Sequence, residues 1–105
     1  GKGYSGVDFR GGASALQKYF DKNLTLPKDA APDDSAKVIR IFYSFYVDEK
    51  GDLSEFKLVK SNCKKCEDAL LEAIKKMPAF LPAKEGGKPK KSKYILPYIK
   101  AYKEK

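Results

Sequence analysis

The sequence contains no histidine. Histidine is the commonest general base in enzymes, the central member of Ser-His triads and a frequent zinc ligand, so its absence excludes the usual forms of these sites. The other residues show no nucleophile beside a base, no glycine-rich phosphate loop and no pair of catalytic carboxylates. We therefore predict that the protein is not an enzyme and uses no cofactor or metal.

Arginine is also scarce, because Arg10 and Arg40 are the only two, although the net charge is +8. The planar guanidinium group suits bidentate recognition of phosphates and base edges, whereas lysine is a hydrated point charge. The positive charge thus fits solubility, protection of a sheet edge or attraction to an acidic partner better than specific reading of nucleic acid. We predict no nucleic-acid partner.

Long hydrophobic runs are missing as well, and none approaches the roughly 20 apolar residues that cross a membrane. The first residues carry Lys2, Asp8 and Arg10 without an apolar run, so we expect no signal peptide in this sequence. The 105 residues suffice for one domain with a single modest core. We expect an arm over residues 1–9 and the domain over residues 10–105.

Two helices are predicted from apolar residues at helical spacing. The first covers residues 12–24 and ends before Pro27. The second begins at Ser61 or Asn62, either of which could cap it, and ends at Pro78. Its buried stripe consists of Cys66, Leu70, Ile74 and Met77.

Three strands are predicted, and the first of them, residues 36–47, is rich in β-branched and aromatic residues. A glycine-containing turn joins it to a second strand over residues 53–60. Phe42 and Tyr46 alternate with the core positions and would lie on the open face of the sheet, where they could form a second contact patch. The core positions of the first strand are Ile39, Ile41, Tyr43, Phe45 and Val47.

The third strand contains Pro97, and a strand proline is tolerated essentially only at a sheet edge. The element order α-β-β-α-β with a right-handed crossover predicts an α+β fold. Its three-stranded mixed or antiparallel sheet has the order 2-1-3, with both helices on one face. The proline-bearing strand then lies at an edge, where another chain can add as an extra strand. We expect this edge to carry the lysines Lys88, Lys90, Lys91 and Lys93.

Several short motifs follow one another in a fixed order along the chain: Phe9-Arg10-Gly11-Gly12, Asn23-Leu24, Phe45-Tyr46-Val47-Asp48, Val59-Lys60-Ser61, Met77-Pro78, Gly87-Lys88-Pro89 and Tyr94-Ile95-Leu96-Pro97. In order and spacing they resemble the C-terminal domain of TonB-type energy transducers, in the form common in Bacteroidetes. Phe80 stands where this family usually has tryptophan, and Lys90 where it has valine.

The resemblance implies a periplasmic domain that grips a short segment, the TonB box, of a TonB-dependent outer-membrane transporter. The segment adds as a strand beside the last strand, and the contact transmits force for uptake from inner-membrane motor proteins. The full-length protein would be anchored in the inner membrane by a segment absent here. Carried onto this chain, the partner-binding positions are Lys91, Ser92, Lys93, Tyr94, Ile95, Leu96, Pro97, Tyr98 and Ile99.

Two other functions stay open, together with a second role for the lysines. A free-standing periplasmic module could share this domain and associate with itself as a homodimer, through Phe42 and Tyr46 or by strand exchange. The lysines near the last strand could also merely protect a bare edge. A basic nucleic-acid-binding domain would need exposed aromatic residues, but Tyr94 and Tyr98 alternate with the neighbouring lysines and should point inward.

The segment Cys63-Lys64-Lys65-Cys66 has the local setting of a thioredoxin-type redox motif, because it follows a strand and opens a helix. The five predicted elements do not supply a thioredoxin-like fold, and two thiolates without histidine are too few for a closed zinc site. We therefore consider a short-range disulfide or two free thiols. In an oxidising periplasm, the disulfide is expected.

Overall fold

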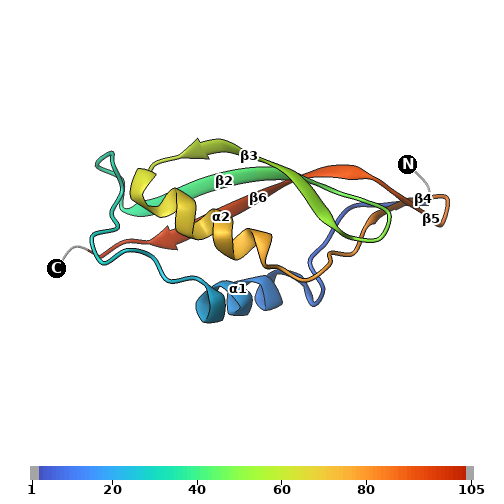
Figure 1. Cartoon of the computed structure of the whole chain (residues 1–105), viewed down its shortest axis with the longest axis horizontal. Coiled ribbons are helices and arrows are strands. Elements are labelled where there is room, and N and C mark those ends of the chain that lie inside the picture. Colours follow the sequence, from blue (N-terminus) through green and yellow to red (C-terminus); the bar gives the residue numbers. More distant parts are fainter. Residues whose placement is uncertain (1–2, 104–105) are drawn as a thin grey trace.

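Two helices and two three-stranded antiparallel sheets make up the chain in a computed structural model that describes residues 3–103 (Figure 1). The predicted α+β class is confirmed. Residues 1–2 of the expected arm and residues 104–105 of the expected domain lie outside the described part.

The main sheet consists of β2 (Val38–Val47), β3 (Leu53–Ser61) and β6 (Ser92–Ala101) in the order β3-β2-β6. This is the predicted order, and it places the proline-bearing strand at an edge. Asp48 shapes the β2–β3 turn, because its carboxylate Oδ1 accepts hydrogen bonds from the backbone N–H groups of Lys50 and Asp52, both at 2.9 Å. These bonds hold the pKa of Asp48 below its ordinary value.

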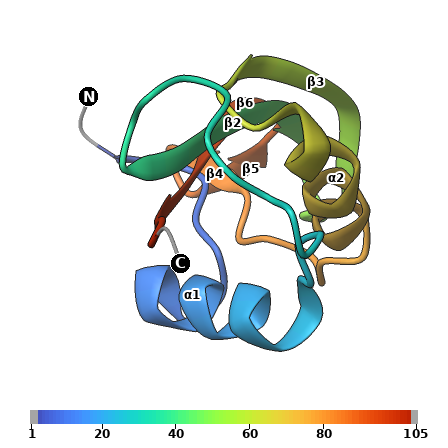
Figure 2. The same cartoon turned by 90° about the vertical axis from the view of Figure 1, so that its left-hand side faces the viewer.

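Helix α1 (Gly12–Asn23), the 3₁₀ turn η1 (Lys64–Cys66) and helix α2 (Glu67–Lys75) cover the same face of this sheet (Figure 2). Helix α2 lies on the β3 side, and α1 lies on the β6 side. The Tyr19 hydroxyl of α1 donates a hydrogen bond of 2.6 Å to the Ala73 carbonyl of α2. The two helices are therefore joined beneath the sheet.

The predicted cap of the second helix is wrong, because Ser61 and Asn62 serve the end of β3 instead. The Asn62 side chain accepts a hydrogen bond from the Arg40 N–H at 2.8 Å and donates one to the Val38 carbonyl at 2.9 Å. The Ser61 hydroxyl accepts from the Cys63 N–H at 3.0 Å. Both side chains are thus already hydrogen-bonded at the end of β3, and α2 begins only after the η1 turn.

Aromatic rings fill the core between the sheet and the helices. Phe80 is fully buried, and its ring packs edge-on against Phe9 at 5.3 Å and against Phe45 at 5.5 Å between centroids. Such edge-to-face pairs are favourable beyond the area they bury. The predicted stripe of the second helix also points into this core, since Cys66, Leu70 and Ile74 are fully buried and Met77 nearly so. Phe80 thus anchors the connector that follows α2.

A small sheet that was not predicted from the sequence lies at one end of the molecule (Figure 1). It consists of β1 (Tyr4–Ser5), β4 (Ala83–Glu85) and β5 (Lys88–Lys90) in the order β1-β4-β5. These strands are two or three residues long, which is too short for an alternating pattern to show in the sequence. The expected placement of Lys88 and Lys90 on the last strand is therefore corrected: they belong to β5.

Candidate strand-addition edge

The main sheet has two free edges, and the edge on β3 is irregular. The β2–β3 register shifts twice, between Phe42 and Tyr43 and again between Ser44 and Tyr46. Within the same strand, Glu55 adopts a left-handed backbone conformation with φ 57°. Bulges of this kind bend a strand and disrupt its row of hydrogen-bonding groups, so they protect an edge from further pairing.

The edge on β6 is regular. Its register with β2 runs without a shift from Val38 opposite Ala101 to Val47 opposite Ser92. All ten residues of β6 are paired on one side and lack a strand neighbour on the other side within the described residues. This edge therefore offers an undistorted template for an additional strand.

Two hydrogen bonds define which backbone groups point to the free edge. The Arg40 carbonyl accepts from the Asn62 N–H, so the backbone groups of Arg40 point toward β3. The Tyr102 N–H donates to the Lys37 carbonyl at 2.9 Å, so the backbone N–H of Tyr102 points toward β2. Backbone direction alternates along an antiparallel ladder. The even-numbered residues of β6 therefore pair with β2, and the outward row consists of Lys93, Ile95, Pro97, Ile99 and Ala101.

Pro97 occupies an outward position in this row. It lies opposite Phe42 at a pair that exchanges no backbone hydrogen bonds, so its missing N–H costs the sheet no ladder bond. The free edge presents N–H donors at Lys93, Ile95, Ile99 and Ala101, with a gap at Pro97. The same proline that marks the edge thus interrupts its donor row once.

The predicted positions 91–99 divide into two sets by the direction of their side chains. Leu96 is fully buried and Tyr98 nearly so, whereas Ile95 and Ile99 are 51% and 55% exposed on the outer face. Tyr94 also points inward, and burial raises the pKa of Tyr94 and Tyr98 above the ordinary value for tyrosine. The inward direction expected for the two tyrosines is therefore what the structure has.

The lysines expected along the edge are distributed differently. Lys93 alone lies within β6, opposite Tyr46. Lys91 lies just before the strand, and its ammonium group sits 3.3 Å from the Glu55 carboxylate and 5.2 Å from the centroid of the Tyr46 ring. Lys91 therefore leans across the outer face toward β3, because an acidic and an aromatic partner both lie there. Of these four lysines, Lys93 alone places its charge directly beside the free edge.

The second predicted patch, Phe42 and Tyr46, is half-buried on the outer face of the sheet. Phe42 lies opposite Pro97, and the neighbouring outward side chains of β6 are Ile95 and Ile99. The sequence prediction did not join Phe42 and Tyr46 to the last strand. Alternation along both strands was the signal that could have joined them into one surface, which we call the outer strip: Phe42, Tyr46, Ile95, Pro97 and Ile99.

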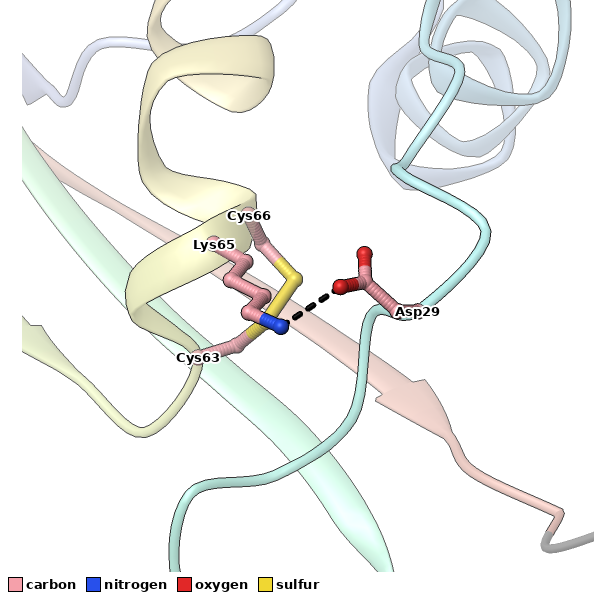
Figure 3. A network of polar contacts seen from close by, with 4 residues as sticks. All are labelled: Asp29, Cys63, Lys65 and Cys66. Carbon is pink, nitrogen blue, oxygen red and sulfur yellow. Dashed lines mark hydrogen bonds and ion pairs between the residues drawn. A yellow bond between two sulfur atoms is a disulfide. The ribbon is translucent and has the colours of Figure 1, made fainter.

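Cys63 and Cys66 form a disulfide at the junction of β3 and α2, and both are fully buried (Figure 3). Beside it, the Lys65 ammonium lies 2.5 Å from the Asp29 carboxylate, which raises the pKa of Lys65 and lowers that of Asp29. The Lys64 N–H also donates to the Asp33 carboxylate at 2.8 Å. The disulfide thus lies beneath a loop that is tied down on both sides of it, where a dithiol substrate cannot approach the sulfur atoms.

We expect the double substitution Cys63→Ala/Cys66→Ala to leave the fold and the β6 edge unchanged. The disulfide closes a very short loop, so its removal should cost about 2 kcal/mol of unfolding free energy. Chemical denaturation measures this loss, and a heteronuclear NMR spectrum checks the fold. A collapse of peptide binding in a variant that still folds would give the cysteines a role that the structure does not predict.

Within the described residues, no group of His, Cys, Asp or Glu side chains could hold a metal ion, and no helix there is long and apolar enough to cross a membrane. Comparison of the chain with protein-family models, with curated proteins and with solved structures gave no match. The functional interpretation therefore depends on the geometry of the edge.

Proposed function

We propose that this chain is a binding domain that captures an extended segment of another protein as an additional strand on the free edge of β6. The observation that carries this proposal is the contrast between the two edges. The edge on β3 is bulged, whereas β6 keeps an unbroken register over ten residues and turns alternate backbone groups outward. Strand addition uses such groups for affinity and uses alternate side chains for specificity.

The affinity expected from this edge is moderate. The outward row offers four N–H donors and five carbonyl acceptors, and each hydrogen bond contributes about 0.5–1.5 kcal/mol net. The entropy of ordering a free peptide offsets part of this gain. A pull along the added strand loads all of these bonds together, so the same contact suits the transmission of force.

In its specific form, the proposal is that the domain belongs to a TonB-like energy transducer. The captured segment is then the TonB box of an outer-membrane transporter, and inner-membrane motor proteins supply the force through a segment absent here. The buried disulfide supports a periplasmic location, since disulfides persist in oxidising compartments. Lys93 and the net charge of +8 favour a segment that carries acidic residues.

A backbone NMR titration with TonB-box-like peptides, one acidic and one basic, tests the proposed function. We expect shifts concentrated at residues 91–99, with slower amide exchange at Lys93, Ile95 and Ile99 and tighter binding of the acidic peptide. Amides of even-numbered residues in β6 are the internal control, because they are already bonded to β2. Shifts elsewhere, without added protection of the outward amides, would refute strand addition.

The outer strip supports a second candidate function, a free-standing module that associates with itself. Ile95 and Ile99 are more than half exposed beside Phe42, and apolar side chains gathered on one face can mark a contact surface. Lys57 and Lys60 are exposed on β3 close to this face, so two copies would bring like charges together. A molecular mass that rises with concentration would support the homodimer, and a constant monomer mass would exclude it.

A further inference from the structure

A groove of about 330 Å³ lies between α1 and the free edge of β6. A smaller hollow of about 160 Å³ continues it and shares with it Gln17, Phe20, Tyr98 and Ile99. The two together follow β6 from Tyr94 to Lys100. The wall on the α1 side consists of Gly12, Ala13, Leu16, Gln17 and Phe20.

The groove exists because the two helices are placed unequally under the sheet (Figure 2). Helix α2 packs beneath β2, where the Tyr43 hydroxyl donates to the Glu67 carbonyl at 3.0 Å. Helix α1 reaches the sheet at β6, where the rings of Phe20 and Tyr98 meet edge-on at 5.3 Å. Its apolar face thus lies beside the last strand of the sheet, and Leu16 on that face is only half-buried.

A strand added to β6 would lie over this groove. Successive side chains of a strand point to opposite faces of the sheet. Those in the same layer as Tyr94, Leu96 and Tyr98 point to the helix-covered face, and the wall of α1 stands beside them. Every second side chain of the captured segment would therefore contact α1, and the others would lie on the outer face near Lys93.

The groove is apolar in its middle and charged toward its ends. Leu16, Ala13 and Phe20 form the central wall, whereas Asp8 lines one end and both Asp21 and Lys100 line the smaller hollow. Carboxylates of a bound segment would lose hydration against the apolar middle of the groove, where no cation among the described residues lines the wall. Apolar side chains would gain by leaving water.

We propose that α1 is the specificity wall of the edge: it selects segments with apolar residues at alternate, groove-facing positions and confines acidic residues to the outer-face positions. This inference rests on the proposed function, because the register of the added strand decides which side chains meet α1. The class of partner that it names is an extended segment in which apolar and acidic residues alternate.

The test compares two synthetic peptides of identical composition, one alternating valine with glutamate or threonine and one with the same residues in blocks. We expect the alternating peptide to bind the whole chain at least tenfold more tightly. Leu16→Asn should weaken binding of the alternating peptide about five- to tenfold, because part of one apolar contact is lost. Ser14→Asn, on an exposed position of α1 outside the groove, should change it less than about twofold.

Ala13→Asn repeats the test at an exposed groove position, in case Leu16→Asn does not fold. Amide exchange at Ile95 and Ile99 separates the two proposals. Equal affinity for both peptides with both amides protected would overturn selection by α1 and leave strand addition intact. An equal effect of Leu16→Asn on both peptides would also overturn it. Absence of protection with either peptide would remove the proposed function and this inference together.

Discussion

Replacing Gly51 by alanine is expected to cost about 2–5 kcal/mol of unfolding free energy, because the substitution combines backbone strain with a steric overlap. Gly51 lies in the β2–β3 turn with φ 91°, a conformation that L-residues rarely adopt. A Cβ atom there would overlap the Phe80 carbonyl oxygen. Neither of the two backbone segments can move away easily, because the Phe80 N–H donates to the Gly51 carbonyl at 2.9 Å and the Phe80 ring is fully buried.

Gly87→Ala is the matched control for this substitution. Gly87 has φ 82° in the β4–β5 turn, and nothing lies within 4 Å of a Cβ atom added there. Its replacement should cost only the conformational strain of about 1–2 kcal/mol. Chemical denaturation of both variants measures the difference. Equal losses would show that the contact between Gly51 and Phe80 is looser than the structure has it.

Ile95→Pro is expected to abolish most peptide binding while leaving the domain folded. The Ile95 N–H points to the free edge, so its removal breaks no bond to β2, just as Pro97 breaks none. A bound peptide would lose the Ile95 N–H as a donor, and the peptide carbonyl opposite it would stay unpaired. This costs about 1–3 kcal/mol of binding free energy, or roughly 5- to 150-fold in affinity. Titration calorimetry with the acidic peptide measures the loss, and circular dichroism checks the fold.

Two companion variants separate the backbone effect from that of the side chain. Ile95→Thr keeps the N–H and a β-branched side chain, so it should bind within a few-fold of the unchanged protein. Leu96→Pro removes an N–H that pairs with β2 and deletes a fully buried side chain, so it should unfold the domain. If Ile95→Pro bound the peptide as tightly as Ile95→Thr, the captured segment would not pair with this edge.

The main sheet could be predicted from the sequence because its signals are strong and local. Alternation over ten residues identifies β2, and Pro97 restricts the last strand to an edge. The small sheet could not be predicted, because its strands are too short to show an alternating pattern. Their pairing also depends on the buried Phe80, which anchors the segment between α2 and β4. The prediction that Ser61 or Asn62 caps α2 failed for a related reason. The Asn62 side chain bonds to Arg40, which is distant in the sequence, and local spacing does not reveal this partner.

The candidate positions 91–99 came from the family resemblance, and the placement of their strand at an edge came from Pro97. The sequence did not reveal which backbone groups of this strand point outward, because that depends on the long-range Tyr102–Lys37 hydrogen bond. The groove could not be foreseen at all, since it depends on where α1 rests against β6. Helical periodicity shows that a helix has an apolar face, but not that part of this face stays uncovered.

The long sequence separation across the β2–β6 ladder has a consequence for how the chain folds. This ladder joins Val38 to Ala101 and Val47 to Ser92, whereas β2 and β3 are joined by a tight turn. Local contacts form before distant ones, because closing a long loop costs more entropy. The β2–β3 hairpin and the α2 turn beside it should thus form first, with β6 arriving last. Until β6 docks, the edge of β2 that faces away from β3 is unpaired. The folding chain therefore passes through a stage in which β2 is a free edge, and β6 of the same chain is the strand that adds to it.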